Sequence, residues 1–285
     1  MFRNIKNNIK TIISNRKFVS GYILFLSVAF IAILGGYLLP KEYFRAGSFH
    51  RGLSPSLVHP LGTDVLGRDI LAQLLWGTQN SIKIGVIVAT IGTFAGAMIG
   101  FISGYYGGLV DDILRVIVDV FLSIPSLLFL ILIASLIKGS VTVELMALII
   151  SLFSWPWPAR QVRAQTLSLK ERDFILVARL SGMGKFEIIL RELMPHMFQW
   201  MGANFINAFL VAILTESGLS ILGLGPQTEM TLGMMLYWAL QHAAIYRGMW
   251  WWWAPPVFML IYLFFSLYMM HLGFDELINP RAREK

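Results

Sequence analysis

The chain contains no cysteine and few charged residues, and each shortage excludes a class of protein. Without cysteine there are no disulfides and no thiolate metal sites. Asp, Glu, Lys and Arg make up 14% of the 285 residues, whereas hydrophobic residues make up 56%. Average soluble domains carry about 25% charged residues. The composition therefore predicts a polytopic membrane protein and excludes an ordinary soluble domain.

Histidine is scarce and scattered as well. We expect no metal site, because metal-ligand spacing on one predicted element is absent among His50, His59, His196, His242 and His271. The net charge of +7 is concentrated in connections between apolar runs. That distribution argues against a nucleic-acid partner and favours a lipid bilayer.

Several apolar runs exceed the roughly 20 residues that a helix needs to cross a bilayer. They predict an all-α protein with six transmembrane helices, at residues 18–39, 81–105, 113–137, 143–159, 196–222 and 255–271. An interfacial helix at 231–246 and an aromatic belt at 250–253 are expected before the last span. Lys and Arg are dense in residues 1–17, 160–195 and 273–285, and we therefore assign these three segments to the cytoplasm. The predicted organisation is a basic cytoplasmic tail (1–17), an anchor helix (18–39), an extracytoplasmic segment (40–80), a five-helix core (81–272) that contains the polar segment 160–195, and a cytoplasmic tail (273–285).

Residues 160–195 form the longest polar interruption in the second half of the chain. Ser168 and Glu171 make a capping box, which predicts a short helix at 169–180. Gly182 and Gly184 predict a sharp turn, and a second amphipathic helix with a Glu187–Arg191 pair follows until Pro195 ends it. One interpretation is a surface helix that rests on lipid headgroups. The other is a docking element for a cytosolic partner, and periodicity alone does not separate the two.

Four glycines recur at every fourth position in the second predicted span: Gly92, Gly96, Gly100 and Gly104. Small residues at this spacing lie on one helix face and let two backbones approach closely. The pattern favours a helix-packing seam over a merely flexible helix. The partner helix is expected either in this chain or in a companion subunit.

A third set of residues is expected to shape a gate or a translocation path. Arg115 and Asp119 lie four apart and are predicted to pair, and Pro125 is predicted to bend its helix. Glu216 is an acid inside a predicted span, which makes it and the adjacent Ser217 functional candidates. Glu216 could instead be hydrated at the outer edge or bonded to a neighbouring backbone.

The segment HPLGTDVLGRDILAQLLWG (59–77) holds three residues that could suggest catalysis, His59, Asp64 and Asp69. Its glycines mark turns, and Arg68 can pair with Asp69 locally. We interpret the segment as structural or receptor-facing rather than catalytic.

Three strings in the chain resemble the ABC importer permeases, most closely the dipeptide/oligopeptide/nickel branch. They are residues 154–195, the HPxGTDxxGRD pattern at 59–69, and TESGLSILGLG at 215–225. The resemblance implies a type I ABC importer permease fold, with residues 160–195 as a cytoplasmic coupling loop, and the C-type member of a permease pair. It further implies a second homologous permease subunit, two ABC ATPase subunits that bind ATP and Mg, and an extracytoplasmic solute-binding protein.

The same resemblance implies which residues meet the ATPase: Arg172, Asp173, Phe174, Val177, Ala178, Gly182, Lys185 and Pro195. One position departs from the family. The Glu-Ala-Ala positions of the family fall on Leu176, Val177 and Ala178, so the glutamate is missing. The departure excludes an ionic contact at Leu176 and implies more apolar docking.

The chain has no phosphate-cradling loop of its own. GMGKF at 182–186 lacks both the upstream glycine and the following Ser or Thr, so another polypeptide must bind any ATP. We expect no catalytic residues and no cofactor in this chain. The expected function is ATP-driven import of di- and oligopeptides across a prokaryotic plasma membrane, with both termini cytoplasmic. Oligosaccharide or nickel import by the same architecture is the alternative, and a secondary transporter or membrane enzyme fits the residues less well.

Overall fold

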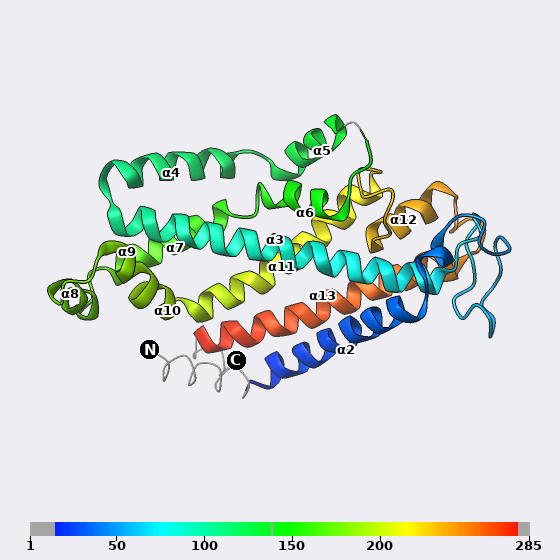
Figure 1. The fold of residues 1–285 in the computed structure, drawn as a ribbon, viewed down its shortest axis with the longest axis horizontal. Helices are drawn as coiled ribbons and strands as arrows, with labels where there is room; N and C mark the ends of the chain where they lie inside the picture. The colour runs from blue at the N-terminus through cyan, green and yellow to red at the C-terminus, as the bar shows by residue number, and fades with distance from the viewer. Residues whose placement is uncertain (1–14, 138, 279–285) are drawn as a thin grey trace.

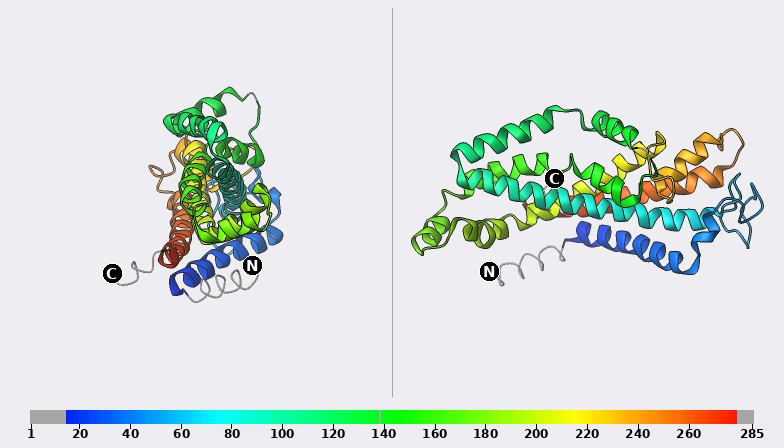
Figure 2. Two further views of the ribbon diagram at one scale, coloured as in Figure 1. Left: turned by 90° about the vertical axis from the view of Figure 1, so that its left-hand side faces the viewer. Right: turned by 45° about the horizontal axis from the view of Figure 1, so that its top comes forward.

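The computed structural model describes residues 15–137 and 139–278 and builds them almost entirely from helices (Figure 1). Neighbouring helices pack in the order α2 on α13, α13 on α11 and α11 on α3. The helices α4 and α5 lie on the opposite side of this body from α2 (Figure 2). The long helices are α2 (Arg16–Leu38), α3 (Ile70–Tyr106), α11 (Phe198–Ile221) and α13 (Trp250–Ile278).

The first predicted span, 18–39, is confirmed by α2. The Asn15 side chain caps α2 by accepting a hydrogen bond from the amide of Phe18 at 3.0 Å. Gly21 lets α2 lie directly on α13, because a Cβ there would stand 2.6 Å from the carbonyl oxygen of Ser266. Residues 1–14 and 279–285, which hold most of both predicted tails, lie outside the described residues.

The second predicted span begins earlier than residue 81. Asp69 caps α3 by accepting from the amide of Ala72 at 2.8 Å, so residues 70–80 form its first turns rather than a connection. The prediction failed there because these residues include polar side chains. Gln73 and Thr78 are nevertheless buried, and Gln73 donates to Asp64 at 3.0 Å.

The loops of residues 45–69 pack over the start of α3 around two buried polar contacts, an arginine–aspartate ion pair and a histidine–aspartate hydrogen bond. The predicted Arg68–Asp69 pair is wrong. Arg68 instead contacts Asp64 at 2.6 Å, while Asp69 meets His59 at 2.7 Å. The observed choice of partners follows from the capping role of Asp69. Its carboxylate is turned away from Arg68 and toward the helix amides. Each acidic group is thus occupied in fixing the loops, which agrees with the structural interpretation of the segment.

The third predicted span is two helices, α4 (Gly108–Ser123) and α5 (Ser126–Leu136), which meet at an angle of 81°. The predicted bend at Pro125 is confirmed, and it is a complete break. Proline donates no amide, and its ring forces the preceding Ile124 into an extended conformation, with φ −81° and ψ 127°.

The fourth predicted span, 143–159, is also divided. Helix α6 (Val143–Ser151) ends well before Pro158, and α7 (Pro156–Leu169) begins at the first proline of the WPWP string. A proline inside a helix usually breaks it. Pro156 instead starts one, because the first helical position requires no amide donor.

Four of the described helices are long and apolar enough to cross a membrane, and five spans result if α4 and α5 count as one. The predicted number of six spans is therefore not confirmed. The shortfall lies at α6, which has 9 residues.

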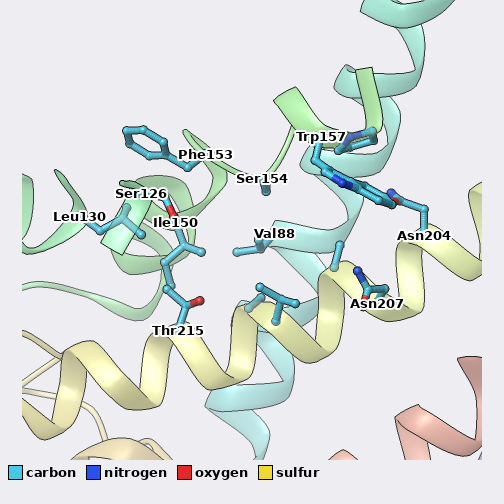
Figure 3. A pocket seen from close by; sticks show the side chains of 14 residues that line it. Val88, Ser126, Leu130, Ile150, Phe153, Ser154, Trp157, Asn204, Asn207 and Thr215 are labelled. Atoms are coloured by element: carbon cyan, nitrogen blue, oxygen red, sulfur yellow. The ribbon is translucent and has the colours of Figure 1, made fainter. Parts of the chain in front are cut away.

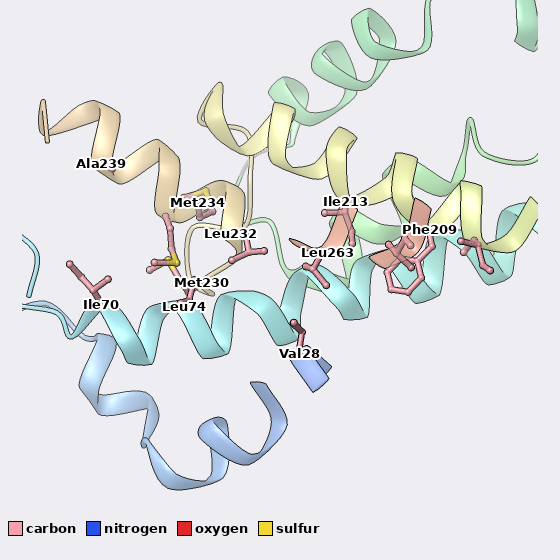
Figure 4. Close-up of a cluster of buried hydrophobic side chains, with 14 of the residues drawn as sticks. Val28, Ile70, Leu74, Phe209, Ile213, Met230, Leu232, Met234, Ala239 and Leu263 are labelled. Atoms are coloured by element: carbon pink, nitrogen blue, oxygen red, sulfur yellow. The ribbon is translucent and has the colours of Figure 1, made fainter. Parts of the chain in front are cut away.

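The largest buried cluster lies where α12 (Leu232–Gln241) packs against α3, α11 and α13 (Figure 4). Leu232, Met234 and Met235 of α12 are fully buried, so this segment is part of the core rather than an interfacial helix. The predicted aromatic belt fails for Trp252, which is fully buried as well. Pro255 and Pro256 lie inside α13 because its first turns are already helical from Trp250.

Candidate functional site

The first candidate site is the hairpin of residues 173–196, which projects from one end of the bundle (left in Figure 1). It consists of α8 (Asp173–Leu180), α9 (Lys185–Ile188), a π-helical turn η2 (Ile189–Leu193) and α10 (Met194–His196). The predicted capping box is wrong because Ser168 lies in the last turn of α7. Helix α8 instead begins after the extended residue Arg172. The negative charge of Asp173 in its first turn interacts favourably with the helix dipole.

Gly182 makes the turn of the hairpin. Its φ of +80° lies in the left-handed region that glycine adopts without strain. The Gly182 amide donates to the carbonyl of Arg179 at 3.0 Å, and the Met183 amide donates to that of Ala178 at 3.2 Å. This pair of bonds is a Schellman motif, which satisfies the last carbonyls of α8 and reverses the chain.

The two faces of α8 are both apolar, although only one is covered. Ile175 and Ala178 pack into a buried cluster with Ile188, Ile189 and Leu193. On the other face Leu176, Val177 and Leu180 are exposed at 54%, 61% and 79% of their surfaces. We call these three residues the apolar ridge. An uncovered ridge of this kind on a short helix is typical of a helix that docks in a groove.

The residues that the resemblance assigned to the ATPase contact divide into two groups. Arg172, Asp173, Val177, Gly182 and Lys185 are exposed on the hairpin surface. Ala178 is buried, and Phe174 and Pro195 are half-buried. The ring of Phe174 is stacked on that of His196, with their centres 4.3 Å apart. Ala178 and Phe174 therefore support the hairpin from inside.

Two aromatic residues at the end of α3 hold the hairpin in place. Arg179 donates from Nε to the hydroxyl of Tyr105 at 3.2 Å and lies 5.3 Å from its ring centre. Lys185 lies 5.3 Å from the ring centre of Tyr106. Such cation–π contacts contribute about 0.5–2 kcal/mol each.

Pro195 does not end the second helix of the hairpin, contrary to the prediction. The π-helical turn η2 precedes it, and helical structure continues through Pro195 to His196. A wider turn accommodates a residue that donates no amide, so the chain bends at Met197 instead. The predicted Glu187–Arg191 ion pair is confirmed at 2.6 Å.

The four-glycine stripe lies against α7 and the residues that lead into it. An added Cβ at Gly92 would meet Ser154 Oγ at 2.5 Å, and at Gly96 it would meet the carbonyl oxygen of Trp155 at 2.5 Å. At Gly100 and Gly104 the obstacles are likewise atoms of residues 159–166. The structure thus places the seam inside this chain. It joins α3 to the helix that leads into the hairpin.

Arg115 and Asp119 do not pair with each other. Arg115 contacts Asp112 at 3.2 Å, while Asp119 accepts from Arg160 of α7 at 2.5 Å. The reason is that α4 lies beside α7, which brings a second arginine within reach. Pro125 stands at the break between α4 and α5.

Sequence reasoning missed the strongest contact between α4 and α7. Arg163 donates from Nε and from a terminal nitrogen to the two oxygens of Asp111, at 2.5 Å each. The hydrogen bonds that Arg163 donates to Asp111 raise the pKa of the Arg163 guanidinium. No local pattern links residues so far apart in the chain.

Glu216 is fully buried among hydroxyl groups that come from three helices or their caps. It accepts from Ser220 and Thr231 at 2.6 Å each and from Ser81 at 3.3 Å. The adjacent Ser217 is buried, and its hydroxyl has no hydrogen-bond partner within residues 15–137 and 139–278. Glu216 therefore joins α3, α11 and α12, and the alternatives of hydration at the edge or bonding to a backbone are both wrong.

A cavity of about 290 Å³ lies between α11 and helices α3, α5, α6 and α7 (Figure 3). Its polar lining includes Asn204, Asn207 and Thr215 of α11, and its aromatic lining includes Trp157. Sequence reasoning missed these residues. Two amide side chains three positions apart inside a predicted apolar span were the signal that could have identified them.

The chain resembles known transport proteins over most of its length. OppC, the oligopeptide transport system permease protein of Mycobacterium tuberculosis (strain ATCC 25618 / H37Rv), is 39% identical over 183 residues, which span 64% of this chain and 63% of OppC. The dipeptide permease protein DppC of Bacillus subtilis (strain 168) is 31% identical over 273 residues, or 94% of this chain and 83% of DppC. The glutathione permease protein GsiD of Pectobacterium atrosepticum is 34% identical over 214 residues, or 74% and 69%.

The fold is also found in a solved transporter. A structure of the MetNI methionine ABC transporter in an inward facing conformation matches with a TM-score of 0.55 at 17% identity, over 73% of this chain and 95% of that one. Residues 96–284 match the family described as binding-protein-dependent transport system inner membrane component. The chain belongs to that family of inner membrane transport components.

Proposed function

We propose that the chain is a permease subunit of an ATP-driven importer of di- and oligopeptides. Its relatives OppC, DppC and GsiD carry the names of peptide and glutathione permeases, which supports this substrate class. The chain forms half of the translocation path and pairs with a second, homologous permease. It carries out no catalysis itself, because ATP and Mg are bound by two separate ATPase subunits. A solute-binding protein delivers the peptide from outside a prokaryotic plasma membrane, and both termini of the chain are cytoplasmic.

The apolar ridge is the observation that carries this proposal. Burial of the exposed parts of Leu176, Val177 and Leu180 in a partner groove contributes roughly 25 cal/mol for each Å² removed from water. Leu176 and Val177 of the ridge occupy the first two of the family's three Glu-Ala-Ala positions, and Leu176 replaces the usual acid. The groove on the ATPase is therefore apolar where it receives Leu176.

Movement of the hairpin reaches the membrane through α7. The glycine seam holds the backbone of α7 directly against α3, and Arg163 fixes α7 to Asp111 of α4. Beside the backbone of α7, the seam contains only the short side chains of Ser154, Pro158, Val162 and Thr166. Displacement of the hairpin therefore carries α7 and α3 together. Helix α5 begins after the break at Pro125, and α11 begins after Met197. These two positions are where α5 and α11 can change their angles relative to α3 and α7.

The substitution Gly182→Asp tests the docking role. A side chain at Gly182 would meet no atom of the described residues within 4 Å, although the φ of +80° strains any residue other than glycine there. The effect of a partner is therefore read by comparison with a variant that shares this strain. We expect ATP-dependent peptide uptake to be abolished while the chain still inserts into the membrane. The measurement is uptake of labelled dipeptide by cells, together with the amount of the chain in isolated membranes.

Gly182→Asn is the matched control, because asparagine has the size of aspartate and tolerates positive φ without adding charge. We expect it to retain more uptake than Gly182→Asp. Normal uptake by Gly182→Asp would contradict the docking role of the hairpin.

A further inference from the structure

One face of α11 carries polar side chains into the cavity of Figure 3. Asn204, Asn207, Val211 and Thr215 are spaced by three or four residues, so they form a stripe along that face. At 1.5 Å per residue the stripe is about 16 Å long, roughly half the thickness of a bilayer's hydrocarbon core. We call it the amide stripe.

The two asparagines of the amide stripe differ in their bonding. Asn204 is buried and donates to the hydroxyl of Thr93 at 2.9 Å. The half-buried amide of Asn207 has no hydrogen-bond partner in the part of the chain that the structure describes. An amide without a partner in an apolar medium costs several kcal/mol, so Asn207 requires water or a ligand in the cavity.

A second cavity, of about 430 Å³, lies on the hairpin side of the same residues. It shares Trp157, Asn204 and Asn207 with the first cavity and adds Trp200 and the His271–Asp275 pair. The rings of Trp157 and Trp200 are stacked, with their centres 6.3 Å apart. The two asparagines and Trp157 thus stand at the junction between two cavities that follow one helix.

The junction is chemically matched to a peptide backbone. A side-chain amide offers one acceptor and two donors, which is what a peptide group needs for its N–H and C=O. The junction residues are uncharged, and the flat ring of Trp157 accepts apolar groups of varied shape. Contacts of this type recognise the part that all peptides share and leave their side chains unread.

We propose that the amide stripe binds backbone amides of a peptide substrate as it passes between the two cavities, with Asn207 as the principal contact. This proposal rests on the proposed function and specifies where and how the substrate is held. It assigns path residues that differ from Arg115, Asp119 and Glu216, each of which is occupied by a partner within the chain.

The absence of cysteine from the chain makes a direct test simple. In the full transporter complex in membrane vesicles, Asn207→Cys is exposed to a water-soluble methanethiosulfonate reagent, and labelling of this chain is followed on a gel. We expect Asn207→Cys to be labelled, and saturating dialanine to slow its labelling several-fold. Gln199→Cys is the matched control, because Gln199 is an amide residue on the same helix that is absent from the lining of both cavities. Its labelling should be insensitive to dialanine.

Uptake kinetics supply a second measurement. Asn207→Leu keeps the size of the side chain but removes the amide, and loss of a hydrogen bond should raise the KM for dialanine about 3- to 10-fold. The unaltered complex should prefer dialanine over its analogue with a methylated peptide nitrogen. In Asn207→Leu that preference should shrink by the same factor as the KM rises. A binding protein affects the preference equally in the unaltered complex and in the variant, so its contribution cancels when the two preferences are compared. Gln199→Leu should change neither value.

The outcomes separate this inference from the proposed function. ATP-dependent dialanine uptake by the unaltered complex tests the function alone, and its absence overturns both proposals. If uptake occurs but dialanine does not protect Asn207→Cys, the function stands and the amide stripe is not the binding site. Protection by maltotriose and not by dialanine would overturn the peptide assignment, because the Trp157–Trp200 stack would then be a sugar platform.

Discussion

Glu216 illustrates how one buried polar residue can join several helices. Its carboxyl group receives hydrogen bonds from Ser220 on its own helix, from Ser81 on α3 and from Thr231 at the cap of α12. Ser81 and Thr231 each have a second bond, since Ser81 accepts from the amide of Leu232 at 3.1 Å and Thr231 from that of Met234 at 3.1 Å. The cluster is therefore a connected network, and its loss affects more than one bond.

Replacement of Glu216 should loosen the attachment of α12. Glu216→Leu removes the acceptor for three buried hydroxyls, and we expect it to lower the free energy of unfolding by about 2–4 kcal/mol. Glu216→Gln keeps a carbonyl acceptor and should lower the free energy of unfolding by less than half as much as Glu216→Leu. The measurement is thermal unfolding of the purified protein in detergent. Equal stability of Glu216→Leu and the unaltered chain would show that the network contributes nothing.

At the scale of elements, the contact of α3 with α7 determines how the hairpin is attached. Backbone carbonyls of residues 155, 159 and 163 lie against the glycine stripe, so the two helices are closer than side chains would allow. The stripe was visible in the sequence because its period of four is local. Its partner was not, because the contacts join the stripe to residues 154–166, which lie far from it in the chain.

Gly96→Ala should force α7 away from α3. The new methyl group would lie 2.5 Å from the carbonyl oxygen of Trp155, a backbone atom that yields only if the whole helix shifts. We expect a loss of about 1–3 kcal/mol in the free energy of unfolding and a fall in peptide uptake. Thermal unfolding in detergent and cell uptake measure the two effects.

Gly218→Ala provides the control within a second long helix, because a Cβ at Gly218 would meet nothing within 4 Å. Alanine favours helix over glycine by about 0.5–1 kcal/mol, so this variant should be as stable as the unaltered chain or slightly more so. A Gly96→Ala variant that matched Gly218→Ala in stability would contradict close contact along the seam.

At the scale of the whole molecule, the two ends differ in character. One end carries the hairpin with its apolar ridge, and the other carries the loops of residues 40–69 together with α12 (Figure 1). The long helices between them expose apolar residues over much of their length, among them Phe30, Phe258 and Ile261. Such a surface is stable when lipid surrounds it, and its two ends then face opposite compartments.

The orientation can be measured with single cysteines, since the chain has none of its own. Ser181→Cys lies on the exposed turn of the hairpin, and Ser54→Cys lies in the exposed loops at the opposite end. We expect a membrane-impermeant maleimide to label Ser54→Cys in intact cells and Ser181→Cys only after the cells are opened. Labelling of Ser181→Cys in intact cells would contradict a cytoplasmic hairpin.

The sequence by itself determined the membrane class, the α2 span, the glycine stripe, the break at Pro125 and the turn at Gly182. Each of these follows from composition or from residues within a few positions of one another, where side-chain chemistry acts directly on the local backbone. For the same reason the sequence placed Glu187 beside Arg191 correctly.

Only the tertiary structure decided the ion pairs between α4 and α7, the hydroxyl cluster around Glu216 and the position of the amide stripe. Arg115 could have paired with Asp119 on a lone helix, but the approach of α7 offers Asp119 the guanidinium of Arg160 instead. The choice between such partners depends on which helices pack together. That packing is set by contacts between residues far apart in the chain, which no local pattern records.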